Sequence, residues 1–365
     1  MVALGELTHF GAATFDLKLK LVEYLHTELG FNRVVLEAGL FSCREAADAL
    51  RRGVSAQDAA RLCLFGGQFC VAGAFPLFEY SQSTLGSKRP LELSGMDPQL
   101  SGTAPRQLLV PRLEEVLGAP VEARQKLAIE HLFSLQLVRT EEQRRTDRNA
   151  LLALQGRIRQ RLGTGSLWAR VVEGLLVLDE DHWDYQFAKR STIETEQLRN
   201  QQMGQNVSWW LSQDPNAKVI VWAASVHLAR THRGFDSPVA AANGNSRENG
   251  VSAGQWLADG LGQDYFAVAV SAAAGSHGLA SGEWRESLGP ADASMLEHAA
   301  LGGALQLLPR SELSARGRAG ALLMGGSVDT AEWGTLFDAV LVLPQERPVE
   351  ARAGCEANRP QASGR

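Results

Sequence analysis

Two short apolar segments, residues 2–5 and 34–36, flank a stretch over residues 12–29 that has the composition of a helix. This strand–helix–strand pattern predicts a βαβ crossover between two parallel strands. Parallel strands joined in this way end at the same edge of the sheet, where α/β proteins bind their ligands. The pattern therefore restricts the chain to α/β architectures and indicates where a functional site would lie.

Two carboxylates and one imidazole follow these strands directly. Glu6 and His9 come after the first strand, and Glu37 ends the second. Because both strand ends lie at one edge of the sheet, we expect the three side chains to converge. Two carboxylates around an imidazole can transfer protons or activate water. A glutamate that caps a helix and a histidine on the surface would show the same spacing. The Glu-x-x-His spacing alone therefore does not decide between a catalytic and a structural role.

The remaining chain alternates strands and helices around a long helical block. Helices are expected over residues 42–52 and from Ser55, whose hydroxyl can cap the helix that follows. Strand signals almost vanish over residues 106–212, which predicts a central helical insertion or cap. Further strands are expected at residues 91–95, 218–222, 265–270, 304–308, 321–324 and 339–343. We therefore predict an α/β fold with a mostly parallel sheet and helices on both faces.

The sequence also predicts where the folded domain begins and ends. We expect one domain over residues 1–344, and a disordered tail over residues 345–365 because that stretch has almost nothing to bury. A strand begins at the first residues, so we expect no signal peptide and a shortened N-terminus.

A second group of polar residues is expected near the same edge. Arg199, Met203 and Asn206 are spaced by four and three, so they share one face of a helix. An arginine and an asparagine turned toward a sheet need partners, and Arg199 is predicted to pair with a carboxylate or an oxyanion. Asp97 follows the strand at residues 91–95, and His227 follows the strand at 218–222. The alternatives are that Arg199 and Asn206 lie on an exposed face of their helix, and that His227 is simply a histidine at the start of a helix.

Charge and composition exclude several classes of function. The net charge of −5 gives no basic footprint for nucleic acid, and no apolar run approaches the roughly 20 residues that cross a bilayer.

The four cysteines, Cys43, Cys63, Cys70 and Cys355, have no zinc-type spacing and are expected to be ordinary thiols of a cytoplasmic protein. No Gly-x-Ser-x-Gly elbow and no phosphate-binding glycine loop occurs. Glu6, His9, Glu37 and His227 could coordinate a divalent ion, but no ligand spacing such as His-x-x-x-His supports it, so we expect no metal or other cofactor.

The order of these motifs resembles the erythromycin esterase family, which also contains proteins linked to succinoglycan biosynthesis. The matching segments are Gly5-Glu6-Leu7-Thr8-His9, Leu36-Glu37, Gly95-Met96-Asp97, Arg199 with Met203 and Asn206, and Trp222-Ala223 with His227. The resemblance implies a metal-independent hydrolase of macrolide lactone esters, an activity connected with antibiotic resistance. It implies His9 as the general base with Glu6 and Glu37 as its partners. The supporting or substrate-binding residues would be His227, Arg199, Lys18, Asp97 and Asn206. A neutral imidazole near pH 7 suits proton abstraction from water.

The chain departs from the family pattern at several positions. Ala224-Ser225 stand where the family commonly has His-Asn, Ala13 replaces an acid, Lys18 an arginine, and Asn200 an aspartate. Loss of an imidazole and a carboxylate that act in the transition state would cost several orders of magnitude in rate.

Three hypotheses follow from these observations. The first is a hydrolase of carboxylic esters or macrocyclic lactones. The second is a weakened or inactive member of the family that binds a small molecule. The third is a metal-dependent hydrolase or peptidase that uses Glu6, His9 and His227. The sequence carries no signal for an oligomeric state.

Overall fold

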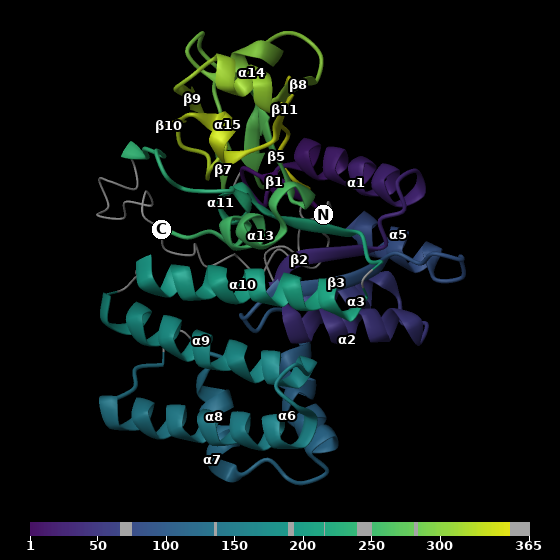
Figure 1. Ribbon diagram of the computed structural model, residues 1–365, viewed down its shortest axis with the longest axis vertical. Helices are drawn as coiled ribbons and strands as arrows, with labels where there is room; N and C mark the ends of the chain where they lie inside the picture. Colours follow the sequence, from purple (N-terminus) through teal and green to yellow (C-terminus); the bar gives the residue numbers. More distant parts are fainter. Residues whose placement is uncertain are drawn as a thin grey trace.

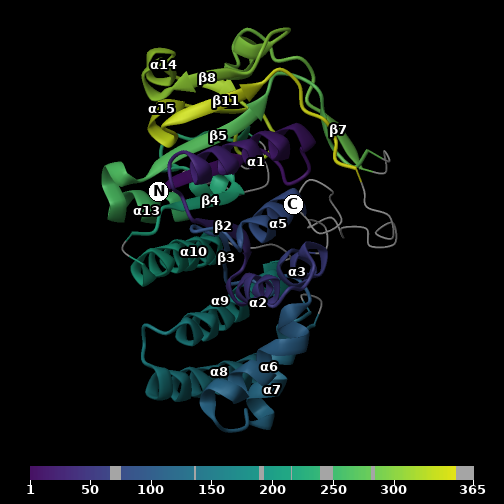
Figure 2. The same cartoon turned by 90° about the vertical axis from the view of Figure 1, so that its right-hand side faces the viewer.

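A seven-stranded sheet in the order β3-β2-β4-β1-β5-β11-β8 forms the centre of the molecule (Figures 1 and 2). The computed structural model describes residues 1–65, 75–134, 137–188, 193–214, 216–238, 250–280 and 284–350. The strands are β1 (Val2–Glu6), β2 (Arg33–Gly39), β3 (Glu92–Asp97), β4 (Val219–Ala224), β5 (Phe266–Ala272), β8 (Gln306–Pro309) and β11 (Ala339–Leu343). All neighbouring strands are parallel except β8, which runs antiparallel to β11. The predicted α/β fold with a mostly parallel sheet is confirmed.

The register of the central strands explains why polar side chains gather at one edge. Glu6 at the end of β1 pairs with Ala224 at the end of β4. Leu36, which precedes Glu37 on β2, pairs with Trp222 on β4. The carboxyl ends of β1, β2 and β4 therefore reach the same edge, as the βαβ pattern predicts.

Both faces of the sheet are buried, and alternate strand residues belong to two separate cores. Ala3 packs in one core together with the helical block, whereas Leu4 packs in the other beside α1 (Ala12–Thr27). The strands are accordingly apolar on both sides, which is typical of a parallel sheet covered by helices. The predicted crossover helix over residues 12–29 is observed, ending two residues earlier than expected.

Within the described residues, three helices lie between β2 and β3 in the chain and pack on the side of the sheet that α1 covers. These are α2 (Leu40–Arg51), α3 (Ala56–Cys63) and α5 (Phe75–Thr84). Ser55 caps α3 as predicted, because its Oγ accepts a hydrogen bond from the backbone N–H of Asp58 at 3.1 Å.

The predicted helical insertion is present as a stack of layers beside the sheet (Figure 1). Its helices are α6 (Ala104–Leu117), α7 (Ala123–His131), α8 (Glu141–Leu162), α9 (Leu167–Ala188) and α10 (Ile193–Gln213). Helix α10 packs against β3, α9 packs on α10, and α8 packs on α9, so the layers lead away from the sheet. The block therefore supplies a wall of the site through α10.

After β4, the chain adds short elements around β5 and β11. They are α11 (Ser225–Leu228), α13 (Ala253–Leu261), β6 (Ser276–Gly278), β7 (Arg285–Ser287), α14 (Arg310–Ala315), β9 (Ala319–Ala321), β10 (Asp329–Ala331) and α15 (Trp333–Leu336), with 3-10 turns at Gly262–Asp264 and Leu296–Ala300. The strand predicted at residues 321–324 is wrong, since only Ala321 belongs to a strand there. Leu322, Leu323 and Met324 are buried outside any strand, and an apolar run fits a buried turn as well as a strand.

The tail was predicted to be disordered over residues 345–365, but its first part, residues 345–350, packs on the fold. Glu346 is 2% exposed, and its carboxylate accepts hydrogen bonds from the backbone N–H of Ala13 at 2.8 Å and from the hydroxyl of Thr14 at 2.5 Å. Val349 is buried in the core on the α1 side of the sheet, and its backbone N–H donates to the carbonyl of Gly278. Composition could not reveal this, because a single buried acid with suitable donors is enough to anchor a short segment. Residues 351–365 lie outside the described part of the chain.

Two of the cysteines expected to be ordinary thiols form a disulfide. Cys43 on α2 and Cys63 at the end of α3 are joined, with their Cα atoms 4.3 Å apart. The packing of α2 against α3 brings the two buried side chains together, which the spacing of 20 residues does not reveal. Cys70 and Cys355 lie outside the described residues.

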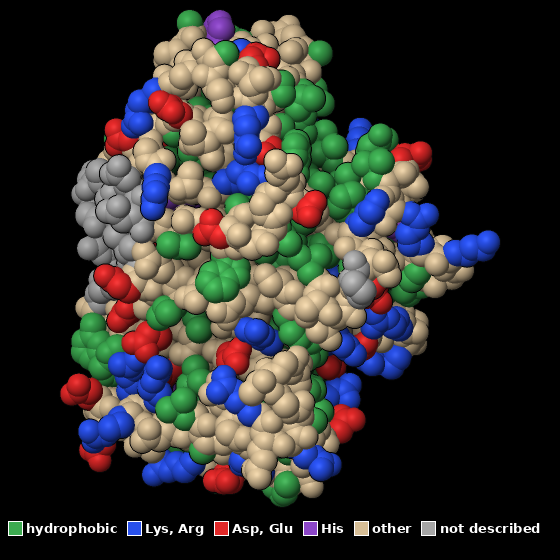
Figure 3. Space-filling model, in the orientation of Figure 1, with side chains coloured by type: hydrophobic (Ala, Val, Ile, Leu, Met, Phe, Trp, Pro, Cys, Tyr) green, Lys and Arg blue, Asp and Glu red, His purple; other side chains and the backbone are tan. Residues whose placement is uncertain are grey.

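The surface of the molecule carries charges of both signs. In Figure 3, Lys and Arg side chains are interspersed with Asp and Glu over the face shown. Within the described ranges, no helix has both the length and the apolar composition that crossing a lipid bilayer requires.

Candidate active site

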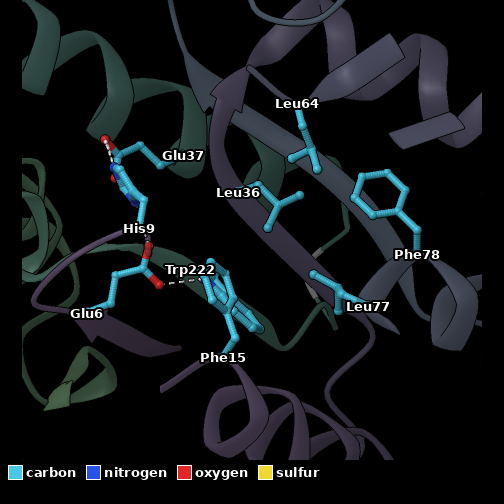
Figure 4. A pocket seen from close by; sticks show the side chains of 9 residues that line it. All are labelled: Glu6, His9, Phe15, Leu36, Glu37, Leu64, Leu77, Phe78 and Trp222. Atoms are coloured by element: carbon cyan, nitrogen blue, oxygen red, sulfur yellow. Dashed lines mark hydrogen bonds and ion pairs between the residues drawn. The ribbon is translucent and has the colours of Figure 1, made fainter. Parts of the chain in front are cut away.

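Glu6 is held by three hydrogen bonds at the end of β1. Its Oε1 lies 2.6 Å from Nδ1 of His9. Its Oε2 accepts a hydrogen bond from Nζ of Lys18 at 2.6 Å. The same oxygen accepts a second hydrogen bond from Nε1 of Trp222 at 2.9 Å (Figure 4). The carboxylate is 3% exposed, so its orientation is set entirely by these partners. Glu6 therefore positions the His9 ring and selects the tautomer in which Nδ1 carries the proton.

Glu37 connects the end of β2 to two histidines and an arginine. Its Oε2 accepts a hydrogen bond from the backbone N–H of Ala224 at 2.7 Å. Its Oε1 lies 3.2 Å from Nε2 of His227, 3.5 Å from Nη2 of Arg199 and 3.8 Å from Nε2 of His9. Ala224, which stands where the family commonly has histidine, thus contributes a backbone donor to the site.

Arg199 on α10 bridges the ends of β2 and β3. Its Nη2 donates to Asp97 Oδ2 at 2.5 Å and its Nε donates to Asp97 Oδ1 at 3.2 Å. Asp97 is completely buried, so the bidentate pair fixes the guanidinium beside Glu37. Burial alone would lower the pKa of Arg199, but Asp97 and Glu37 outweigh it and raise that pKa, so the group stays charged.

His227, at the end of the short helix α11, is held from two sides. Its Nδ1 lies 2.7 Å from Oδ1 of Asn200, and its Nε2 faces Glu37. The close approach of α11 to β1 depends on Gly5, because a Cβ at that position would lie 2.5 Å from Oγ of Ser225. Asn200 and His227 are part-buried, so this contact defines one end of the site.

The electrostatics of the site differ from the sequence-based expectation of a neutral imidazole at pH 7. Burial alone would lower the pKa of His9, but the charge of Glu37 and the hydrogen bond and charge of Glu6 outweigh it and raise the pKa to about 9. His9 is therefore protonated at neutral pH. The physical reason is that two carboxylates with depressed pKa values flank one imidazole.

Lys18, which contacts Glu6, is a second cationic side chain that can titrate. Burial lowers its pKa to about 8, although the charge and hydrogen bond of Glu6 oppose that change. Its Nζ also lies 4.3 Å from the centre of the Trp222 ring, a cation–π contact. The side chain is 0% exposed, so it acts on the site through Glu6.

The structure thus brings together most of the residues singled out in the sequence: Glu6, His9, Lys18, Glu37, Asp97, Arg199 and His227. Asn206 is not among them. Its Nδ2 donates to the backbone carbonyl of Met96 at 2.8 Å, and its Oδ1 accepts a hydrogen bond from Gln202 at 3.0 Å. Asn206 therefore supports β3, one residue before Asp97.

Sequence reasoning missed Trp222 and Asn200 as site residues. Trp222 faces the same core as Leu4 and Leu36, a placement that strand alternation could have indicated. Asn200 follows Arg199 directly and reaches His227 from the helix α10, a contact between elements that sequence spacing does not report.

A cavity of about 430 Å³, counted with its open mouth, adjoins these groups (Figure 4). It is lined by Glu6, His9, Phe15, Leu36, Glu37, Leu64, Leu77, Phe78 and Trp222. The charged side chains lie at one side and the apolar ones at the other (Figure 4). Among the described residues, no group of three or more His, Cys, Asp and Glu side chains has an arrangement that could hold a metal ion.

The carboxyl edge of the sheet thus carries an imidazole between two carboxylates beside an apolar cavity, which is where α/β proteins bind their ligands. The sequence model of the erythromycin esterase family matches residues 26–301, and the chain belongs to that family. This membership supports an esterase-type hydrolase role.

Solved structures share the fold at low sequence identity. The chain is similar to a succinoglycan biosynthesis protein, with a TM-score of 0.73 and 16% identity over 95% of this chain and 88% of that chain. A protein from Bacillus cereus gives a TM-score of 0.71 and 16% identity over 96% and 90% of the two chains. A mutant of the erythromycin esterase EreC in its open conformation gives 0.69 and 18% over 94% and 90%. The search of curated proteins finds no match.

Proposed function

We propose that the chain hydrolyses carboxylic esters, lactones included, with His9 as the general base, water as the nucleophile and no metal ion. The observation that carries this proposal is the orientation of the His9 ring. Its Nδ1 is bound to Glu6 at 2.6 Å and its Nε2 is 3.8 Å from Glu37, beyond a hydrogen bond, while His9 itself lines the cavity. An ester carbonyl in the cavity would lie next to the basic nitrogen.

The reaction follows from this geometry. Nε2 of neutral His9 takes a proton from water as the water oxygen bonds to the carbonyl carbon. The positive charge of Arg199 beside the site stabilises the negative charge that develops on the carbonyl oxygen. When the bond to the alcohol oxygen breaks, that oxygen takes the proton from Nε2. Glu6 keeps the proton on Nδ1 throughout, which preserves the basic character of Nε2.

The raised pKa of His9 limits the rate at neutral pH. With a pKa of about 9, about one molecule in a hundred carries the neutral imidazole at pH 7. The proposed enzyme is therefore more active in alkaline solution. A bound ester that displaces water from Glu37 would alter this balance, because desolvation changes the strength of the ion pairs.

The direct test measures hydrolysis of several macrolides and simple esters by the wild type and by His9→Ala. We expect turnover by the wild type and a loss of at least about a hundredfold in the variant, the usual contribution of a general base. Circular dichroism and thermal unfolding show whether the variant folds. Normal turnover by folded His9→Ala would refute His9 as the base.

A small-molecule-binding protein without catalysis is the second candidate. It is favoured by the residues that depart from the family pattern, Ala13 and Ala224, and by the charged state of His9 at neutral pH. Thermal unfolding with the same esters and lactones separates the two candidates. Stabilisation by a ligand that is never hydrolysed, even at pH 9, would favour binding.

The metal-free mechanism has its own test. Protein purified without chelator is analysed for bound metal, and its hydrolysis is compared before and after treatment with a chelator. A stoichiometric ion whose removal abolishes hydrolysis would replace the proposed mechanism with a metal-dependent one.

A further inference from the structure

The apolar part of the cavity beside His9 is built from separate elements of the fold. Phe15 comes from α1, Leu36 from β2, Leu77 and Phe78 from α5, and Trp222 from β4. Each of these side chains is no more than 6% exposed. The wall is therefore part of the packed core rather than a loose surface patch.

Within the described part of the chain, the side chains of this wall offer no partner for a hydroxyl group. Glu6 already accepts three hydrogen bonds, and the indole N–H of Trp222 is one of their donors. Among the described lining residues, the other polar side chains are His9 and Glu37, which belong to the reacting end. A sugar ring placed against the wall would lose its hydrogen bonds to water without replacement, which disfavours its binding.

The shape of the cavity favours a slender group. The rings of Phe15 and Trp222 are stacked with centroids 5.7 Å apart, and both residues line the cavity. Trp222 is held in place by Glu6 and by the cation–π contact with Lys18, so its ring cannot turn away easily. Because the volume of about 430 Å³ includes the open mouth, the space enclosed by the wall is smaller than that figure, which favours a narrow group over a bulky one.

We infer that this cavity binds an unbranched hydrocarbon chain joined directly to the ester group, so that the preferred substrates are esters of aliphatic acids or alcohols rather than esters of sugars. The inference rests on the proposed function, because it places the ester carbonyl at His9. It adds the substrate class, which neither the family nor the reaction determines.

The first experiment measures kcat/KM at pH 9 for p-nitrophenyl esters from acetate to decanoate, for alkyl acetates of matching lengths, and for an acetylated glucoside. We expect kcat/KM to rise with chain length, by up to about fourfold for each methylene, until the cavity is filled. The two ester series show whether the chain belongs to the acid or to the alcohol. A flat profile in both series, or faster hydrolysis of the glucoside, would overturn the inference and leave the proposed hydrolysis intact.

The second experiment changes the cavity in opposite directions. Leu77→Phe fills space and should move the maximum of kcat/KM to shorter chains, whereas Leu77→Ala enlarges the cavity and should move it to longer ones. Leu109→Ala is the matched control, since Leu109 is an equally buried leucine on α6 outside the lining. The control should keep the wild-type profile even if it is less stable. Identical profiles for wild type and both Leu77 variants would contradict the assignment.

A binding measurement separates failure of this inference from failure of the proposed function. Calorimetric titration with octan-1-ol requires no turnover, and we expect wild-type binding that weakens at least about tenfold in Leu77→Phe. Octanol binding without hydrolysis of any ester would retain the cavity assignment and refute the esterase. Hydrolysis without octanol binding, or octanol binding that Leu77→Phe leaves unchanged, would refute the cavity assignment alone.

Discussion

Nζ of Lys18 lies 2.6 Å from Oε2 of Glu6, and the two side chains are 0% and 3% exposed. A fully buried lysine thus supports the carboxylate that positions His9. Because a buried charge without a partner is costly, each member of this pair depends on the other.

Lys18→Met should therefore destabilise the protein. Removal of the ammonium leaves Glu6 buried with one fewer positive partner, and we expect the free energy of unfolding to fall by about 3–5 kcal/mol. It should also raise the pKa of His9, since the charge of Lys18 lowers that pKa in the wild type. Chemical denaturation and the pH profile of hydrolysis measure these two effects.

The control for this variant is Lys126→Met. Lys126 is 46% exposed and pairs with Glu114 on the surface, so its loss should change stability by no more than about 1 kcal/mol. Equal stability of the Lys18→Met and Lys126→Met proteins would show that the buried ion pair has no special importance.

The pH dependence of hydrolysis reports the charge of His9. If the neutral imidazole is the base, kcat/KM should rise about tenfold per pH unit from pH 6 to about 8 and level off near pH 9, where the pKa of His9 lies. His298→Gln, at an exposed position, should leave the profile unchanged. Activity that falls between pH 7 and pH 9 would mean that His9 acts in its protonated form.

The same raised pKa makes stability depend on pH. Protonated His9 stabilises the folded state, and this contribution is complete below the unfolded value of 6.5 and is lost as the pH rises through about 9. Across this window, the free energy of unfolding of the wild type should therefore fall by about 1–2 kcal/mol relative to that of His9→Gln. This figure is kept small because the His9 side chain is 31% exposed and solvent screens its charge. Parallel stability curves for the two proteins between pH 6.5 and pH 9 would contradict the raised pKa.

Glu346 should stabilise the start of α1. Its carboxylate accepts hydrogen bonds from the backbone N–H and the hydroxyl of Thr14 and from the backbone N–H of Ala13. Glu346→Ala leaves these donors unpaired, and we expect a loss of about 1–3 kcal/mol by thermal or chemical unfolding. Glu350→Ala, at an exposed position, should have no measurable effect. Comparable losses in the two variants would argue against a specific anchor at Glu346.

Local patterns in the sequence were sufficient to predict the main helices and strands and their order. The crossover over the first 37 residues and the apolar strands at 218–222 and 339–343 depend on side-chain periodicity, which is a property of neighbouring residues. The meeting of Glu6, His9 and Glu37 followed from the rule that parallel strands end at one edge. These inferences need no knowledge of distant contacts.

The tertiary structure alone decided the charge of His9, the burial of Lys18, the orientation of Asn206, the Cys43–Cys63 pairing and the anchoring of Glu346. Each of these properties depends on groups that are distant in sequence and near in space. Electrostatic and hydrogen-bond energies change steeply over a few ångströms, so they are determined only when the packed neighbours and their distances are known.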